Sequence, residues 1–320
     1  MNCPDPPVPV ASELIDLLQC PVSGEPLHWQ GGMLVSASGR NEYRVTDSAI
    51  PVMAAGQWSH EGVTQSQHYD RVAAAYLRNL TYAHTQEYMR YLDNALLQAT
   101  DGAVFDTVAE VCCGRGEALQ LFRTRIGRGV GLDVSLRMLE AGRSVFPHDQ
   151  FLFVQGDATG MPLRSECFDC VFTLGGIHHV NDRPSLFREV FRILKPGGRF
   201  YWREPVSDLF LWRWLRHLIY RISPGLEHDT ERPLRWHDTW PLMQSVGFEP
   251  VLWRTYGFLG YCFLMNSDIL VFNRAFHFVP GIRAITRCAT YLDDLTVRLP
   301  GLRLAGLQVV GYARKPGGQS

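Results

Sequence analysis

The stretch FDTVAEVCCGRGEALQLFRTRIGRGVGLDVS, residues 105–135, joins two apolar segments through a glycine-containing loop. Its residue pattern predicts a strand at 105–112, a helix at 116–126 and a second strand at 127–134. A strand, a helix and a strand in this order form a unit whose two strands lie parallel in one sheet. The stretch therefore predicts an α/β fold.

The same alternation continues along the chain on both sides of this stretch. Helices are predicted within 69–100, at 135–146 with Ser135 as the N-cap and at 182–194, and strands at 150–157, 168–176, 199–206 and 304–316. The segment 239–257 is predicted as a helix followed by a strand. Repeated units of this length predict a doubly wound, mostly parallel sheet of seven strands with helices on both faces.

Residues 12–58 follow a different pattern, with short apolar runs separated by turn signals such as QGGM. We therefore predict a small β-rich domain at 1–58 and a larger domain at 59–320. Within the larger domain, 101–206 is expected to bind a cofactor, and 207–300 to supply a helical, aromatic-rich lid over an apolar acceptor pocket.

Composition excludes several classes of function. The chain has 320 residues, 46% of them hydrophobic, and a net charge of −1, which argues against a nucleic-acid partner. Eight scattered cysteines without an apparent signal peptide favour reduced thiols in the cytoplasm. No run of about 18 apolar residues predicts a membrane span.

The loop after the first strand of the sheet is the expected ligand site, because doubly wound sheets bind ligands beyond the carboxyl ends of their strands. Gly114 and Gly116 allow a close backbone approach, and Asp133 ends the next strand, where an acid meets ribose hydroxyls. A dinucleotide motif needs a small residue where Leu119 stands, and Glu110 would repel a pyrophosphate. The loop therefore favours a cofactor with a ribose and a charged amino acid group over NAD.

The cysteines in and near this loop raise the alternative of a metal site. Adjacent thiolates such as Cys112 and Cys113 rarely reach one ion, and no second pair at zinc spacing stands nearby. Cys167 and Cys170 do have that spacing, but they fall on a predicted strand and are expected to be buried there. We predict no metal.

The ordered motifs EVCCGRGE, GLDVS, VQGDATGMPL, FTLGGIHHV and FREVFRILKPGGRFYWREP resemble those of class I S-adenosylmethionine-dependent methyltransferases of the ubiquinone/menaquinone type. The resemblance spans about 65–206 and implies a Rossmann-like sheet and S-adenosylmethionine as the cofactor. YDRVAAAY, with Tyr69 and Tyr76, resembles the helix that covers the cofactor in that group. The cofactor-binding residues implied are Tyr69, Tyr76, Glu110, Cys112, Gly114, Gly116, Asp133, Val134, Met138, Asp157, Ala158 and Leu174.

Within that set, the resemblance implies a part of the cofactor for each position. Glu110, Gly114 and Gly116 would hold the methionine part, and Asp133 the ribose. Asp157 and Ala158 would flank the adenine, and Leu174 would lie where the chain passes the sulfonium. Cys112 departs from the family, which has glycine at this position; because cysteine is small, we expect cofactor binding to survive, while an altered cofactor pose or a loss of methyl transfer stays open.

The N-terminal unit resembles the small zinc-ribbon domain that partners tRNA methyltransferases. Only Cys20 remains of the metal-ligand positions, with Ser23 in place of the second cysteine. One thiolate does not build a four-ligand zinc site. We therefore expect a metal-free unit that serves packing or substrate closure.

Two further groups of residues are candidates for chemistry or partners. His178, His179 and Glu204 lie at predicted strand ends and are candidate catalytic acid–base groups, although the histidines could equally pack and cap the loop. The amphipathic segment 208–222, with Trp212 and Trp214, could either pack on the domain or touch a membrane surface.

Together these features predict an S-adenosylmethionine-dependent methyltransferase acting on a small, apolar or lipid-like acceptor at oxygen or carbon. Two alternatives stay open: the same cofactor-binding fold performing cyclisation or decarboxylation, and a catalytically silent binding or activator subunit.

Overall fold

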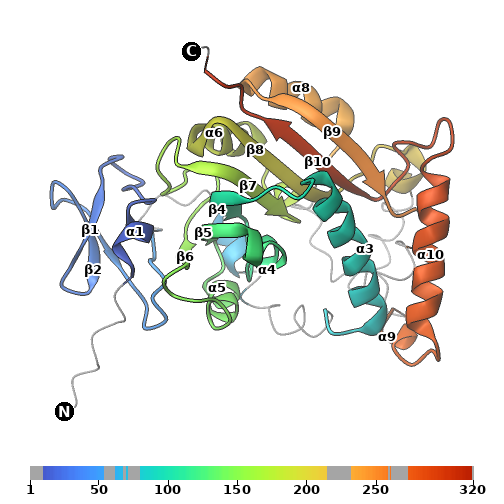
Figure 1. The fold of residues 1–320 in the computed structure, drawn as a ribbon, viewed down its shortest axis with the longest axis horizontal. Helices are drawn as coiled ribbons and strands as arrows, with labels where there is room; N and C mark the ends of the chain where they lie inside the picture. Colours follow the sequence, from blue (N-terminus) through green and yellow to red (C-terminus); the bar gives the residue numbers. More distant parts are fainter. Residues whose placement is uncertain are drawn as a thin grey trace.

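A seven-stranded sheet forms the centre of the computed structural model, which describes residues 10–53, 62–67, 70, 80–214, 232–258, 260 and 273–318. The strand order is β6-β5-β4-β7-β8-β10-β9 (Figure 1). The strands are β4 (Phe105–Val111), β5 (Ile126–Asp133), β6 (Phe151–Gln155), β7 (Phe168–Leu174), β8 (Leu194–Pro205), β9 (Glu249–Tyr256) and β10 (Gln308–Arg314). Strands β4 to β8 pair in parallel, whereas β10 runs antiparallel to β8 and β9. The predicted α/β fold with a mostly parallel sheet is confirmed.

Helices connect these strands. The helices are α3 (Ala83–Ala99), α4 (Glu117–Leu121), α5 (Leu136–Arg143), α6 (Arg183–Ile193), α8 (Trp236–Val246), α9 (Asn273–Phe276) and α10 (Ile282–Thr296), with single 3₁₀ turns η1 (Arg123–Arg125) and η2 (Ile177–His179). Ser135 is the N-cap of α5, as predicted, and its hydroxyl accepts from the Met138 N–H at 3.3 Å. Helix α4 ends earlier than predicted because Ile126 is taken up by β5, where it pairs with Phe105.

Two apolar layers cover the sheet, one on each face. Neighbouring strand residues alternate between them: Ala109 joins the layer with Leu186 of α6, and Val108 joins the layer with Leu96 of α3. Helices α6 and α8 thus lie on one face, and α3, α4 and α5 on the other (Figure 1). Because both faces are covered, the strands are buried runs, and the ligand site is left to the ends of the strands.

A small N-terminal sheet packs against the first of these layers. The sheet is formed by the antiparallel strands β1 (Leu27–Gln30), β2 (Met33–Ser36) and β3 (Glu42–Arg44), and the short helix α1 (Ser12–Ile15) precedes it in the same unit. Leu34 and Tyr43 belong to the same buried cluster as Val154 of β6. The Met53 N–H donates to the Gln155 carbonyl at 2.8 Å, which fastens the unit at the end of β6.

Cys20, which stands at the one metal-ligand position kept from the zinc-ribbon resemblance, is hydrogen-bonded inside the unit. Its sulfur lies 3.0 Å from the Tyr43 hydroxyl and accepts from the Ser23 N–H at 3.3 Å. The Cys20 and Tyr43 side chains are both buried. The thiol therefore contributes to the hydrogen bonding and packing of the small sheet.

Several predicted features fall wholly or partly outside the described residues, namely Tyr69, Tyr76, 215–222 and part of the predicted lid. Within 208–214, Trp212 packs on the domain, which is one of the two alternatives that the sequence leaves open. It is buried, and its indole N–H donates to the Ala305 carbonyl at 2.6 Å, whereas Phe210 and Trp214 are exposed. The described part of the chain contains no helix with the length and apolar character needed to cross a bilayer.

Candidate functional site

A cavity of about 900 Å³ opens at the carboxyl ends of the parallel strands. It is lined by Gly62, Gln65, Cys112, Cys113, Gly114, Arg115, Glu117, Leu132, Asp133, Val134, Met138, Gly156, Asp157, Ala158, Thr159, Leu174, Gly175, Gly176, His179 and Val180. This is the edge of the sheet at which the sequence predicts the ligand site. Eight of the predicted cofactor residues line the cavity: Cys112, Gly114, Asp133, Val134, Met138, Asp157, Ala158 and Leu174.

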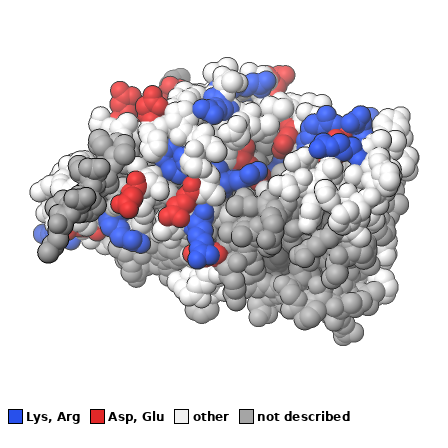
Figure 2. Space-filling model, turned by 90° about the horizontal axis from the view of Figure 1, so that it is seen from below, with Lys and Arg blue, Asp and Glu red and all other residues white. Residues whose placement is uncertain are grey.

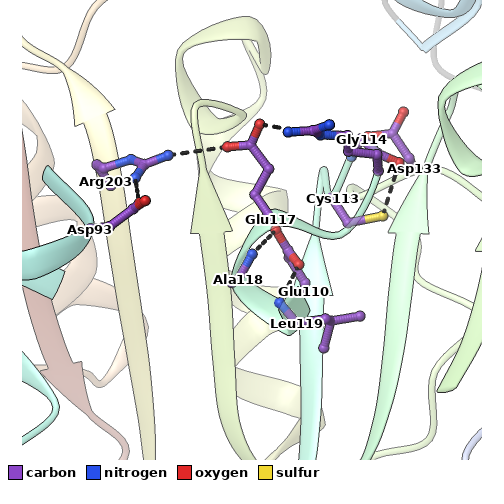
Figure 3. Close-up of polar contacts among 10 residues, drawn as sticks. Asp93, Glu110, Cys113, Gly114, Glu117, Ala118, Leu119, Asp133 and Arg203 are labelled. Atoms are coloured by element: carbon purple, nitrogen blue, oxygen red, sulfur yellow. Dashed lines mark hydrogen bonds and ion pairs between the residues drawn. The ribbon is translucent and has the colours of Figure 1, made fainter. Parts of the chain in front are cut away.

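The loop after β4 is held to the end of β5 by one carboxylate. Asp133 accepts from the Gly114 N–H at 2.7 Å (Figure 3) and from the Ser135 N–H at 2.8 Å. Gly114 has a φ of 53°, and a Cβ built on it would lie 3.3 Å from the Met138 methyl. The turn therefore requires both the glycine and the carboxylate, and it brings backbone and side chain of two strands to one wall of the cavity.

Cys112 occupies the left-handed region of backbone space, with a φ of 55°. A side chain in that region is strained, which is why glycine usually stands in such turns. The side chain is accommodated because Gly176 faces it: a methyl group on Gly176 would overlap Cys112 Cβ and lie 3.0 Å from its sulfur. Burial raises the pKa of the Cys112 thiol well above its usual value, so the group is a neutral wall of the cavity.

Glu110 does not reach the cavity, which differs from its predicted contact with the methionine part. Its two carboxylate oxygens accept from the Ala118 and Leu119 N–H groups, both at 2.9 Å, and the side chain is buried (Figure 3). Burial raises its pKa to about 8. Glu110 therefore orients the start of α4, because free N–H groups at a helix start attract an acceptor.

Gly116 packs the loop against β6. It has a φ of 86°, and a Cβ there would lie 3.0 Å from the Phe153 ring. The residue allows the loop to pass close to β6, and it does not line the cavity. The described contacts give Gly116 a packing role, and its contact with the cofactor stays a prediction.

Glu117 lines the cavity and was missed by sequence reasoning. The buried Arg203 of β8 donates to Glu117 at 3.2 Å and also pairs with Asp93 of α3 (Figure 3). An acidic residue directly after the GRG motif was the available signal. The network ties the start of α4 to β8 and α3, on the side of the sheet that carries the cavity.

Gln65, from the short described segment 62–67, was also missed. Its side chain is 5% exposed and lines the cavity. Within the described part of the chain, neither its amide oxygen nor its amide nitrogen has a hydrogen-bond partner. Buried amides are normally paired.

Asp157 follows β6 and places a carboxylate in the cavity wall. One of its oxygens accepts from the Thr159 N–H at 2.8 Å and from the Thr159 hydroxyl at 2.7 Å. This turn fixes the carboxylate next to Ala158, which also lines the cavity.

The three predicted catalytic residues lie together, but only His179 lines the cavity. Glu204 is fully buried and accepts from the Gly176 and Ile177 N–H groups at 2.7 and 2.9 Å, and its other oxygen lies 2.8 Å from His178 Nδ1. The His178 and His179 rings lie 3.8 Å apart. Burial raises the Glu204 pKa to about 7, against the lowering effect of these backbone N–H groups.

Comparisons with known proteins point to a methyltransferase domain. A model described as a methyltransferase domain matches residues 109–202. The chain is 30% identical over 198 residues to a ubiquinone/menaquinone biosynthesis C-methyltransferase of Pectobacterium carotovorum, which covers 53% of this chain and 74% of the relative. It is 37% identical over 97 residues to a 2-phytyl-1,4-naphtoquinone methyltransferase of Thermosynechococcus vestitus, which covers 29% of this chain and 43% of that relative.

Among solved structures, the fold is similar to that of the [4+2]-cyclase SpnF. The TM-score is 0.55 at 17% identity, over 80% of this chain and 97% of that one. At this identity the likeness concerns the fold alone.

Proposed function

This chain belongs to the class I S-adenosylmethionine-dependent methyltransferases, and we propose that it methylates a small, apolar, lipid-like acceptor at oxygen or carbon. S-adenosylmethionine is its cofactor. The acceptor class is supported by the two relatives, whose names point to quinones and a phytyl-substituted naphthoquinone. The observation that carries the proposal is the cavity, with carboxylates from two neighbouring strand ends and His179 from the loop after a third.

The residues around the cavity fit S-adenosylmethionine. Each carboxylate oxygen accepts more than one hydrogen bond, so Asp133, already fixed by two N–H groups, would also accept from the ribose hydroxyls. Asp157 and Ala158 would flank the adenine. A Cβ built on Gly175 meets none of the described residues within 4 Å, which leaves open space beside Leu174 for the methionine part. Gln65 would give its buried amide to the bound molecule.

When bound, the cofactor supplies an electrophilic methyl group on a sulfonium. The chain's own contribution is to hold the acceptor in line with that group and to exclude water. His179 would take the acceptor's proton, because it is the member of the His178–Glu204 group that lines the cavity. Glu204 would act through His178, whose ring it orients from the buried side.

Calorimetry with S-adenosylhomocysteine tests cofactor binding. Asp133→Ala and Gln65→Ala should each weaken binding about tenfold or more. Asp149→Ala changes an exposed aspartate and serves as the matched control. Unchanged affinity in Asp133→Ala would remove the proposed ribose contact.

Incubation with methyl-labelled cofactor and a prenylated hydroquinone tests the reaction. We expect labelled product from the parent protein and a loss of transfer, with binding retained, in His179→Ala. Unlabelled product would favour non-methylating chemistry such as cyclisation or decarboxylation, which the departure at Cys112 leaves open. Cofactor binding without any product would favour a silent binding or activator subunit.

Two finer points stay predictions. Contact of 208–222 with a membrane is supported only by the exposed Phe210 and Trp214 within its described part. A cytoplasmic location rests on the scattered cysteines.

A further inference from the structure

Helix α10 lies at the outer edge of the molecule beside α3 and runs in the same direction (Figure 1): Arg283 and Arg287 contact Gln86 and Glu87 near the start of α3, and Asp294 contacts Tyr91 further along it. The side chains that it buries are mostly polar or only partly apolar: Ile282, Thr286, Thr290 and Asp293, followed by Val297 after the helix. Asp293 is engaged there by the hydroxyl of Tyr88 and by the Gly260 N–H. The buried side of α10 thus rests on hydrogen bonds as much as on apolar contact.

The opposite side of α10 is apolar and exposed. We call it the outer stripe; its residues are Ile285, Tyr291, Leu292, Leu295 and Leu299, which are 47%, 67%, 61%, 44% and 54% exposed. The first four lie within α10, and their spacing by three, four and seven positions places them along one side of the helix, whereas Leu299 follows the end of the helix at Thr296. A helix on a globular domain normally turns this side inward. In α10 the apolar side is turned outward, so the surface is suited to an apolar partner.

Arginines flank the outer stripe on one side. The side chains of Arg287 and Arg298 are 64% and 61% exposed, whereas their partners Glu87 and Asp294 are 5% and 22% exposed. Arg283 is also exposed and is bound to a neutral amide, that of Gln86. The surface beside the stripe is therefore positive.

A wider view agrees with this distribution of charge. On the face shown in Figure 2, Lys and Arg side chains gather toward the end of the molecule at which α3 and α10 stand in Figure 1. Over the rest of that face, charges of both signs are interspersed.

We propose that the outer stripe of α10 docks on an anionic lipid surface, with the helix parallel to the membrane plane. A surface helix of this kind buries its apolar side at the boundary of the acyl chains while its basic side chains meet anionic headgroups. A second copy of the chain fits less well in an antiparallel two-fold contact, because that contact through the stripe would bring arginine flanks of like charge together. The inference rests on the proposed function in one respect: a lipid-like acceptor is drawn from a bilayer.

Sedimentation with lipid vesicles tests this proposal on the full chain. One set of vesicles is phosphatidylcholine alone, and in the other about one third of the lipid is phosphatidylglycerol. The parent protein should bind the anionic set more tightly, and added salt should weaken that binding. Tyr291→Glu/Leu292→Glu should lower binding at least about tenfold, and the uncharged Tyr291→Gln/Leu292→Gln should change it in the same direction.

The matched control is Val104→Glu/Val145→Glu, which adds the same charge at residues 76% and 58% exposed elsewhere. It should bind vesicles like the parent. Equal binding by the parent and the stripe variants would overturn the proposal, as would a parent protein that ignores anionic vesicles. Analytical ultracentrifugation tests the alternative of a second copy. If the parent and the control variant were dimers and the stripe variants monomers, the proposal would be overturned in favour of a second copy.

Calorimetry with S-adenosylhomocysteine separates this outcome from the proposed function. The stripe variants should bind S-adenosylhomocysteine like the parent, which also shows that they are folded. If the parent protein does not bind vesicles but transfers label to a detergent-dispersed acceptor, docking is refuted and the proposed reaction is retained. Vesicle binding without label transfer would support docking and refute the reaction.

Discussion

Replacing Gly176 by alanine should break the contact on which Cys112 depends. The backbone of Gly176, at φ −117° and ψ −36°, is open to any residue. Its added methyl would overlap Cys112 Cβ and lie 3.0 Å from the sulfur. Overpacking of this kind costs about 1–3 kcal/mol, and it would also disturb the Gly176 N–H that donates to Glu204.

Replacing Cys112 by glycine should by itself change stability little. It relieves the left-handed strain of roughly 1 kcal/mol and offsets that gain by a comparable loss, since glycine has more freedom in the unfolded chain and the thiol is no longer buried. In the double variant the methyl added at position 176 no longer meets a cysteine side chain, and its nearest remaining neighbour is the Thr173 methyl at 3.1 Å. The two changes should therefore be coupled by about 1–3 kcal/mol.

Urea unfolding of the parent, the two single variants and the double variant measures this coupling. Calorimetry with S-adenosylhomocysteine on the same four proteins should show weakest binding in Gly176→Ala and recovery in the double variant. Gly160→Ala is the control, because a Cβ there meets none of the described residues within 4 Å. Additive free energies of unfolding, within the roughly 0.5 kcal/mol expected of independent sites, would refute the argument.

Three other changes have defined outcomes. The raised pKa of Glu204 means that the folded protein holds this proton more tightly than the unfolded chain does. The stability that the bound proton contributes is therefore full below about pH 4.5 and is lost as pH rises through about 7. Glu204→Gln should flatten the fall of the urea midpoint over that window, and an unchanged slope would contradict the raised pKa. Arg203→Met should cost about 2 kcal/mol in urea unfolding and weaken S-adenosylhomocysteine binding, since it removes the cation shared by Asp93 and Glu117 and leaves Glu117 with only the more distant Arg115, at 3.9 Å, among the ion pairs of the described residues. Unchanged stability would show that the network does not contribute to stability. Trp212→Phe should lower the free energy of unfolding by about 1 kcal/mol, because the hydrogen bond to the Ala305 carbonyl is lost. An unaltered thermal midpoint would contradict a stabilising role for this hydrogen bond.

Local pattern was enough to predict the core of the sheet. Buried strands such as 105–111 are short apolar runs bounded by glycine or by helix caps, and these signals lie within a few residues of one another. Ser135 was predicted as a cap for the same reason, since its role depends only on the residues that follow it. Asp133 was placed at the cavity because parallel strands end at a common edge.

Contacts between distant segments could not be predicted in this way. Glu110 has the motif position of a ligand contact, yet its carboxylate is used by the first turn of α4. Gln65 lies in a short segment without a recognisable motif, and only the folded chain brings it to the cavity. For α10, periodicity defines an apolar side, but whether that side faces inward depends on Asp293 and its partners on other segments.

The place of β10 between β8 and β9 has a consequence for the order of folding during synthesis. Among the described strands, β9 is at the edge of the sheet and joins it only through β10, whose residues Gln308–Arg314 pair with Glu249–Tyr256. Residues 249–256 therefore have no partner among the described strands until 308–314 have left the ribosome, whereas β4 to β8 can already assemble. Such a late, non-local pairing is slow and leaves an apolar edge at β8 open in the nascent chain. A nascent chain whose translation stops shortly before residue 308 should thus be bound by chaperones, even though its cofactor-binding strands are complete.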